Sequence, residues 1–540
     1  MRQLLTLRGA RPLTMALDFT TVPDGPRFVD ELPADRSGVD YLNLRQVNLD
    51  MMEECIPGLN NVTSHVRPYS VMCWVYWKAW QNAHRRPVTA DEILILREKT
   101  ESLFLWGHKL HGMGVVPGRR AKVPAPLRGR VSLRFGAWHR SLKNTSLQAA
   151  VQYGPSLLQL GFLQKTDEGI YRVTSRGEIL AEALDARLSK RTAYRVLDTQ
   201  SETSAVESDA DDLFEAWRYD RASERERSEF RQALYVESAI GQSRSPVARR
   251  STMIWLVLDL LRRARRPLSA VELRDAIAYR RLSRRRTFPF EGPPLQQSKK
   301  WQFLLVRQLH RLALETSMGW MEEKLILRQA QTVEELSNLA FKRIATELGC
   351  REGSTLANLM SKASRIITTD ELLLAAIDEE PEKHDFQSLA TRIVDLTDDS
   401  FDDAFGAAFR ALLLIGNCDR WLSGDDHLRA FIGRGGSVRI SVKYWLEIVD
   451  RMKVLPARRM LEYFFGNLII SQHFAVATNR YDGKTSRLRL ALDEAAIESL
   501  VAPDPWYPRI TPDGLDALLS VMTSCAILEQ DDNEAFTIHE

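Results

Sequence analysis

The sequence lacks the features of a disulfide-bonded or membrane-spanning protein. Its five cysteines are odd in number, widely scattered and never arranged as a Cys-x-x-Cys pair. This usage indicates a reducing, cytoplasmic environment and argues against a disulfide framework or a cysteine-rich zinc site. No run of about 18 apolar residues exists, so no membrane span is predicted. A chain of 540 residues with 44% hydrophobic and 27% charged residues is expected to fold into about three to four domains.

The common catalytic and nucleotide-binding motifs are also missing. There is no G-x-S-x-G, HExxH or protein-kinase set, and the turn Gly433–Ser437 has no Lys-Ser/Thr after it. His108 and His111 lack a nearby third ligand, and the acidic run Asp398–Asp403 lacks EF-hand spacing. We therefore expect no metal or other cofactor and favour a protein that is not an enzyme. Glu322–Lys324 supplies an E-x-K pair, which keeps a divergent metal-dependent nuclease open as an alternative.

One long stretch contains no acidic residue. Between Ser102 and Thr166 there is no Asp or Glu, although lysines and arginines are frequent there. The net charge of +3 is therefore a sum of segregated charges, because acidic residues gather at Asp198–Glu215 and Asp370–Asp403. A basic tract without carboxylates suits phosphate contacts, since each Lys or Arg releases condensed counterions. An acidic protein face and an anionic lipid are the alternative partners.

The stretch His65–Trp80, HVRPYSVMCWVYWKAW, is unusually aromatic. On a helix its large side chains form a single stripe, which suits either a core or a platform for stacking nucleic-acid bases. Exposure would cost roughly 1.5–3 kcal/mol for each large apolar side chain, and stacking recovers a comparable energy only while a ligand is bound. We therefore predict a core, with Arg67, Lys78 and His84 as surface contributors. The stripe consists of Tyr69, Cys73, Tyr76, Trp77 and Trp80.

Composition shifts divide the chain into six expected segments. The first fourteen residues have three arginines and no acid, and we expect a disordered leader with Met15 as an alternative start. The segments are an irregular N-terminal arm (1–60), aromatic-rich helices with a basic loop and a winged-helix module (61–195), an acidic linker and helix (196–245), a second helix-turn-helix-like module (246–300), a helical domain (301–425) and a helical C-terminal domain with β-hairpins (426–540).

Residues 140–190 contain the clearest module. Two short helices, Ser146–Tyr153 and Ser156–Leu160, are expected on either side of a Gly-Pro break. The β-prone runs Phe162–Thr166 and Ile170–Thr174 then predict a hairpin, and a further helix follows. The segment GFLQKTDEGIYRVTSRGEILAEAL resembles the wing and trailing helix of bacterial winged helix-turn-helix proteins.

This resemblance implies a module that binds DNA or docks another protein. The basic tract immediately upstream favours DNA, because arginines there would lie beside the module. The residues expected to contact nucleic acid are Arg119, Arg120, Lys122, Arg128, Arg130, Arg134, Arg140, Lys143, Gln148, Gln152, Lys165 and Arg172.

Two further regions carry similar patterns. Thr252–Ala264 and a helix opened by the Ser269/Glu272 capping box resemble the start of a second winged helix within an arginine-rich region, although no wing follows. Near the end of the sequence, TPDGLDALLSVM predicts a helix, and Cys525–Glu529 with Ala535–His539 predicts a wing-like hairpin. Another hairpin is expected from Phe474–Asn479 and Ser486–Leu492.

The sequence therefore predicts a mainly α, multi-domain protein with winged-helix modules and small β-hairpin wings on a helical scaffold. We expect a cytoplasmic, nucleic-acid-binding subunit, with DNA as the expected ligand, of a multi-protein bacterial complex that also contains other protein subunits. It is loosely similar to uncharacterised subunits of bacterial defence operons, which implies a role in antiviral defence. A helical adaptor that uses winged helices to dock proteins is the first alternative, and the nuclease is the second.

Overall fold

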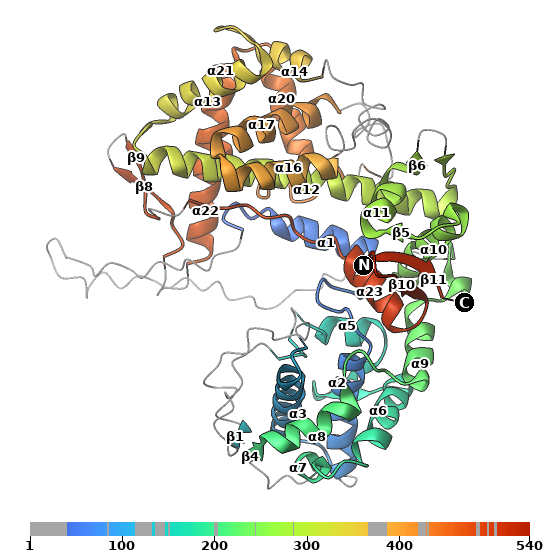
Figure 1. Ribbon diagram of the computed structural model, residues 1–540. Helices are drawn as coiled ribbons and strands as arrows, with labels where there is room; N and C mark the ends of the chain where they lie inside the picture. The colour runs from blue at the N-terminus through green and yellow to red at the C-terminus, as the bar shows by residue number, and fades with distance from the viewer. Residues whose placement is uncertain are drawn as a thin grey trace, which may run out of the picture.

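The computed structural model shows a mainly helical protein with small antiparallel sheets (Figure 1). Within the described residues, no helix is long and apolar enough to cross a membrane. The structure describes residues 40–83, 86–113, 132–135, 146–149, 152–198, 204–242, 245–283, 286–364, 386–418, 428, 431–481, 486–493, 496–501 and 505–539.

The lower lobe in Figure 1 is built around helix α2, Arg67–Asn82. This helix packs against α3, Ala90–Leu110, and α6, Ser175–Leu188, and it contacts strand β3, Tyr171–Val173. The other elements of the lobe are β1 (Ser132–Arg134), α5 (Gly154–Gln159), β2 (Leu163–Lys165), α7 (Tyr194–Asp198), β4 (Ser204–Val206), α8 (Glu207–Trp217) and α9 (Glu224–Leu234). Strands β2 and β3 form one antiparallel hairpin, and β1 pairs with β4.

The aromatic stretch forms the core of this lobe, as predicted, but only along part of its length. Tyr69, Trp74 and Tyr76 are at most 1% exposed. Trp77 and Trp80, at the C-terminal end of α2, are only partly buried. The stripe therefore begins in the core and ends at the surface of the lobe.

The predicted hairpin is confirmed, and so is the short helix directly before it, as α5. The described part of the first predicted helix, Ser146–Tyr153, is not helical. Residues 146–149 and 152–153 form turns, because Ser146 Oγ and the Leu147 amide both donate to the Glu101 carboxylate, at 2.6 and 3.0 Å. The Gly-Pro pair, predicted as a break, instead starts α5, where proline needs no amide partner. The further helix predicted after the hairpin is confirmed as α6, with Thr174 as its N-cap.

The middle of the molecule joins two distant parts of the sequence. Helices α10, Pro246–Ala264, and α11, Ala270–Tyr279, flank the short strand β5, Leu268–Ser269. The predicted terminal helix and hairpin are confirmed as α23 (Leu515–Ser524), β10 (Leu528–Gln530) and β11 (Ala535–Ile538). Strand β11 lies between β10 and β5 in one three-stranded antiparallel sheet.

The upper lobe is organised by α12, Gly292–Ile326, which is 35 residues long and crosses the expected boundary at residue 300. Helices α16, Phe386–Asp399, and α17, Phe401–Asn417, pack along it (Figure 1). The other elements of the upper lobe are α13 (Val333–Leu348), α14 (Leu356–Ser364), α20 (Val442–Met452), α21 (Ala457–Tyr463), a π-helix (Phe464–Ser471), α22 (Gln472–Asn479), β8 (Leu490–Asp493) and β9 (Ala496–Ser499). Three short elements contact α10 or α11, directly or through each other: η2 (Glu237–Ala239), β6 (Arg281–Ser283) and β7 (Arg286–Thr287).

Two predictions of irregular or extended structure are wrong. The N-terminal arm contains helix α1, Arg45–Cys55, whose Val47, Met51 and Cys55 are buried at helical spacing. The strand predicted at 474–479 is part of α22, and the hairpin of this region forms instead between β8 and β9. In α1 the apolar face that α12 covers determines the local structure.

Candidate nucleic-acid interface

A hollow of about 510 Å³ opens on the lower lobe where α2 meets the β2–β3 hairpin. We call it the aromatic hollow, because two tryptophans line it. Its lining residues are Trp77, Trp80, Gln81, Arg86, Arg172, Val173 and Glu178. They come from the end of α2 and the segment after it, from β3, and from the first turn of α6. Its volume lies within the range of roughly 300–1,000 Å³ found for ligand sites.

The hairpin fixes one wall of the hollow. The indole Nε1–H of Trp80 donates to the carbonyl oxygen of Tyr171 at 3.2 Å, which holds the ring against β3. The neighbouring Arg172 places its guanidinium carbon 5.1 Å from the centroid of the Trp80 ring. Such a stack of a cation on an indole leaves the outer N–H groups of the arginine directed away from the ring.

Some charged side chains around the hollow have ion-pair partners and others do not. Arg86 and Glu92 form an ion pair, and Arg86 together with the Thr89 amide lowers the pKa of Glu92 to about 2. By contrast, Arg172 and Lys165 are exposed and have no carboxylate partner among the described residues. Lys165 Nζ lies 6.0 Å from the Tyr171 ring centroid on the same hairpin. These two cations are therefore available to an external anion.

The hollow can accommodate two kinds of group. The tryptophan rings offer apolar faces on which a planar base can stack. Guanidinium and ammonium groups at the rim suit phosphate oxygens. Gln81 is exposed and can both donate and accept, and Glu178 can accept a hydrogen bond from an amino group.

Four of the twelve predicted nucleic-acid-binding residues have described side chains, and two of these four lie at the hairpin. Lys165 and Arg172 occupy the adjacent strands β2 and β3. Arg134 lies on β1 opposite Ser204, and only its backbone is described. The residues that lie outside the described ranges are Arg119, Arg120, Lys122, Arg128, Arg130, Arg140 and Lys143.

The two predicted glutamines do not lie on a helix that could enter a groove. Gln148 is in a turn, and its Oε1 accepts a hydrogen bond from Arg97 at 2.6 Å. Gln152 is also in a turn, and its backbone carbonyl accepts from Asn60 at 2.5 Å. Both residues connect the segment before α5 to its neighbours, so their placement supports a structural role.

Two of the three surface residues expected from the aromatic stretch are engaged internally. Arg67 is completely buried and pairs with Glu226 at 3.2 Å, so the expectation that it lies at the surface is wrong. Lys78 pairs with Asp198 at 2.6 Å. His84 lies outside the described residues. The sequence missed Gln81, Arg86 and Glu178 as members of the hollow, because only folding brings them beside the hairpin.

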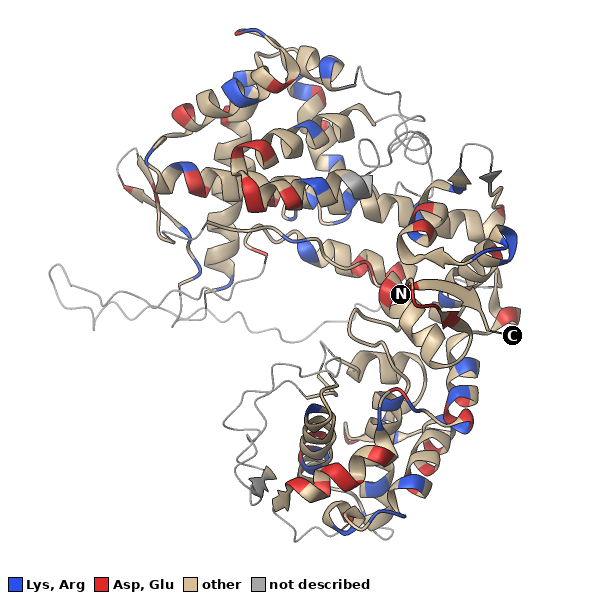
Figure 2. Cartoon of the chain, in the orientation of Figure 1, with Lys and Arg blue, Asp and Glu red and all other residues tan. Residues whose placement is uncertain are grey.

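The described surface of the lower lobe is mixed in charge. Figure 2 shows acidic residues along α8 and both signs of charge along α9. Two residues of the acidic cluster have local partners, since Asp211 contacts His111 at 2.7 Å and Asp212 lies 3.9 Å from Arg191. Among the described residues of this lobe, Arg172 is distinguished by its position against the Trp80 ring at the aromatic hollow.

The candidate histidine and E-x-K sites have internal partners. Buried His108 donates from Nδ1 to the Phe104 carbonyl at 2.7 Å, and its Nε2 accepts from the Tyr219 amide at 3.1 Å. Glu322 is fully buried and pairs with Arg489 at 2.6 Å, and Lys324 pairs with Asp402 at 3.0 Å. No group of three His, Cys, Asp or Glu side chains within the described ranges is placed to hold a metal ion.

The acidic run Asp398–Asp403 caps and pairs helices. Asp402 and Asp403 lie in the first turn of α17, where negative charge is favourable. Asp402 accepts from the Trp320 indole at 2.7 Å, and Asp403 accepts from Arg343 at 2.9 Å. These contacts give Asp402 and Asp403 a structural role at the start of α17.

Comparison with known protein families, with curated proteins and with solved structures finds no match to this chain. The function is therefore inferred from the chemistry of the aromatic hollow and the hairpin beside it.

Proposed function

We propose that this protein binds nucleic acid, with DNA as the first candidate, through the aromatic hollow and the β2–β3 hairpin. The observation that carries the proposal is the combination of two accessible tryptophans, Trp77 and Trp80, with Arg172 and Lys165, which have no carboxylate partner among the described residues. Alternating aromatic and cationic groups are typical of surfaces that bind single-stranded or locally opened nucleic acid.

The elements around the hollow support a winged-helix interpretation. Helix α5, the β2–β3 hairpin and α6 follow one another in the order that the sequence resemblance implies for its second helix, wing and trailing helix. Lys165 also belongs to the basic tract that contains no acid from Ser102 to Thr166. A wing that carries free cations can contact the phosphate backbone beside the stacked base.

A second set of elements has a similar order, but its parts come from distant segments. Helix α10, β5 and α11 are completed by α23, β10 and β11 through the shared sheet. We interpret this set as a split winged helix, in which the terminal hairpin supplies the wing that the sequence does not show after α11. We assign this split winged helix a structural role, because it joins the two lobes.

We extend the proposal to a subunit of a multi-protein bacterial complex, with genome defence as the suggested setting. The chain offers a large helical scaffold beside a small basic and aromatic site, as a subunit that delivers nucleic acid to partner enzymes would need. Purification of the protein together with the products of neighbouring genes tests this part, and recovery of the protein alone would contradict it.

The binding test separates phosphate contacts from base stacking. Arg172→Ala and Lys165→Ala should each weaken binding to a fluorescent single-stranded oligonucleotide and lower the slope of log K against log salt by about 1. Trp80→Leu should weaken binding by about 1–3 kcal/mol and leave that salt slope unchanged. Fluorescence anisotropy measured across a salt series reports both quantities.

The matched control for these variants is Arg351→Ala, at an exposed arginine of the upper lobe. It should bind like the parent protein. Circular dichroism of each variant verifies that the helical content is retained. Failure of the parent protein to bind any oligonucleotide at low salt contradicts the proposal, and so does equal binding by all four variants.

A protein-docking function is favoured by the position of α23. In the split module this helix already makes protein contacts, because Ser524 Oγ accepts from the Val66 amide at 3.0 Å. The carbonyl of Cys525 accepts from Arg231 of α9 at 2.9 Å. A winged helix whose central helix binds protein within the chain is consistent with an adaptor. Absence of retention on DNA at about 0.1 M salt, together with recovery of a protein partner, would favour this alternative.

A further inference from the structure

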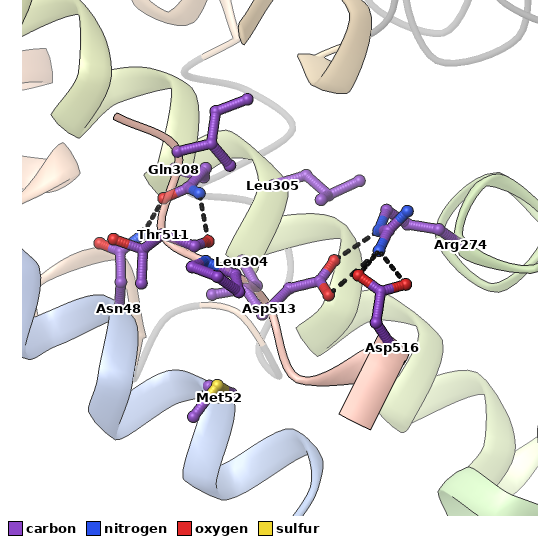
Figure 3. A pocket seen from close by; sticks show the side chains of 11 residues that line it. Asn48, Met52, Arg274, Leu304, Leu305, Gln308, Thr511, Asp513 and Asp516 are labelled. Atoms are coloured by element: carbon purple, nitrogen blue, oxygen red, sulfur yellow. Dashed lines mark hydrogen bonds and ion pairs between the residues drawn. The ribbon is translucent and has the colours of Figure 1, made fainter. Parts of the chain in front are cut away.

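A second cavity, of about 340 Å³, lies in the middle of the molecule between α1, α11, α12 and the segment that leads into α23. We call it the Asn48 cavity. Figure 3 shows the side-chain amides of Asn48 and Gln308 at one end and the ion pairs of Arg274 with two aspartates at the other. The lining residues are Asn48, Met52, Arg274, Leu304, Leu305, Gln308, Ile510, Thr511, Pro512, Asp513 and Asp516.

The orientation of each amide in this cavity is determined by its neighbours. Gln308 Oε1 accepts from Arg311 at 3.4 Å, and Gln308 Nε2 donates to the Thr511 carbonyl at 2.6 Å. Gln308 therefore presents an oxygen to Asn48, and Asn48 Nδ2 donates to it at 2.9 Å. Asn48 cannot rotate its amide without placing two oxygens, or two N–H groups, against each other.

The fixed orientation leaves one strong acceptor unused. Within the part of the chain that the structure describes, Asn48 Oδ1 has no hydrogen-bond partner, and the residue is only 3% exposed. A buried polar atom without a partner costs about 1–3 kcal/mol. A ligand that brings an N–H or O–H donor to this oxygen removes that cost.

The opposite end of the cavity carries excess negative charge. Arg274 Nε lies 2.5 Å from Asp513 Oδ2, and Arg274 Nη2 lies 3.3 Å from Asp516 Oδ2. One guanidinium thus faces two carboxylates. The Asp516 side chain is 67% exposed, so it can accept a further donor from a ligand. This end of the cavity favours a cation over an anion.

The wall between these two ends is apolar. Met52, Leu304 and Leu305 are buried there, and Ile510 and Pro512 complete the surface. A flexible hydrocarbon chain of a few carbons fits such a wall, whereas a highly hydrated inorganic ion gains nothing from it.

We propose that the Asn48 cavity binds a short aliphatic amine that carries a second hydrogen-bond donor. The ammonium group contacts Asp516 and Asp513, the alkyl chain lies along Met52 and Leu304, and the second donor contacts Asn48 Oδ1. This inference does not rest on nucleic-acid binding, because the cavity and the aromatic hollow share no residue.

The test compares four probes of equal chain length with the full protein. Isothermal titration calorimetry and thermal-shift measurements use 1,4-diaminobutane, butylamine, 1,4-butanediol and succinate at millimolar concentration. We expect 1,4-diaminobutane to bind most tightly and butylamine to bind more weakly, because butylamine lacks the second donor. Neither 1,4-butanediol nor succinate should bind, because the first lacks charge and the second carries the wrong sign.

Two variants locate the binding. Asp516→Asn should weaken 1,4-diaminobutane about tenfold, which corresponds to about 1.4 kcal/mol. Asn48→Ala should abolish the advantage of 1,4-diaminobutane over butylamine. Because Asn48 is buried, retained folding of that variant is verified by its thermal transition, and exposed Asp516 gives an independent test.

The control variant is Glu352→Gln, which removes an exposed carboxylate of the upper lobe. It should leave the affinity for 1,4-diaminobutane unchanged. The proposal is overturned if no amine binds, if 1,4-butanediol or succinate binds as tightly as the diamine, or if Asp516→Asn binds like the parent protein.

Discussion

At the residue scale, buried arginines connect segments that are distant in the sequence. Arg250 of α10 is 1% exposed and donates to three backbone carbonyls, those of Pro57 at 3.0 Å, Leu234 at 3.0 Å and Ala233 at 2.9 Å. Burial lowers the pKa of Arg250 to about 10, so the side chain remains charged at neutral pH. Its planar fork satisfies carbonyls that would otherwise be buried without donors.

Replacing Arg250 with lysine tests this geometry while retaining the charge. Lysine cannot reach three separate carbonyls with a fixed fork, and loss of charge-assisted hydrogen bonds should cost about 3 kcal/mol. Differential scanning calorimetry should show a thermal midpoint several degrees lower. The control is Arg262→Lys at an exposed position of the same helix, which should keep the parent midpoint. Equal midpoints in both variants would mean that the fork is unnecessary.

Three histidines with lowered pKa values should make the folded protein less stable in mild acid. Burial lowers the pKa of His65, His108 and His473 to about 4, below the ordinary value of 6.5. A lowered pKa in the folded state means that the unfolded chain binds the proton more strongly. The contribution of these residues is therefore complete above about pH 6.5 and is lost progressively as the pH falls toward 4.

His108 allows this pH dependence to be measured at one residue. Its Nε2 accepts from the Tyr219 amide, so protonation would break that bond. His108→Gln retains a donor and an acceptor but does not titrate. Thermal midpoints recorded from pH 7 to pH 4 should fall less steeply in this variant than in the parent. The same slope in both proteins would exclude a role for His108 in the acid sensitivity.

At the element scale, α12 organises the upper lobe because other segments of the protein pack closely against its backbone. A Cβ at Gly319 would lie 2.2 Å from the Trp506 carbonyl oxygen and 2.8 Å from the Phe401 ring. Near the same part of the helix, Glu322 accepts from the Trp506 amide at 2.6 Å. Glycine is thus required for packing at this position.

A matched pair of glycine substitutions separates packing from helix propensity. Gly319→Ala should destabilise the protein by about 1–3 kcal/mol, because the added methyl group forces the Trp506 segment away. Gly466→Ala adds a methyl group whose nearest neighbour is 4.0 Å away. It should be neutral or stabilising by up to about 1 kcal/mol, since alanine favours helices. Urea denaturation measures both, and equal effects would contradict the packing argument.

Elements with local signals could be predicted from the sequence, and those that depend on distant contacts could not. Ser269 forms the predicted capping box with Glu272, and the two predicted hairpins around short polar turns are present. Helix α1 was not predicted, because the apolar face with Val47 and Met51 can be recognised as part of the core only in the folded protein, where α12 packs against α1. For the aromatic hollow, the helical stripe predicted a core, but only the position of β3 shows that the stripe ends at the surface.

At the scale of the whole molecule, one sheet joins regions that lie far apart in the sequence. Phe536 of β11 is paired in register with Leu268 of β5, and both are buried. The helix-turn-helix-like segment and the last segment therefore share one sheet. No pattern within either segment could reveal this pairing.

Removing the Phe536 side chain should weaken both halves of that sheet. Phe536→Ala is expected to cost about 3–5 kcal/mol, since a large buried side chain leaves a cavity. Hydrogen exchange measured by mass spectrometry should show faster exchange in peptides that cover β5 and α11 as well as in the terminal hairpin. Asp532→Ala, in the exposed turn between β10 and β11, is the control. Unchanged exchange at β5 would show that the pairing contributes little.

The split core also constrains how the protein is synthesised. Helices α10 and α11 emerge from the ribosome long before residues 515–538 exist. Leu268 therefore stays without its strand partner Phe536, and α11 without α23, while more than two hundred further residues are translated. A nascent chain in this condition exposes apolar surface and is prone to aggregation. Chaperone demand should therefore persist until translation of the last strand is complete.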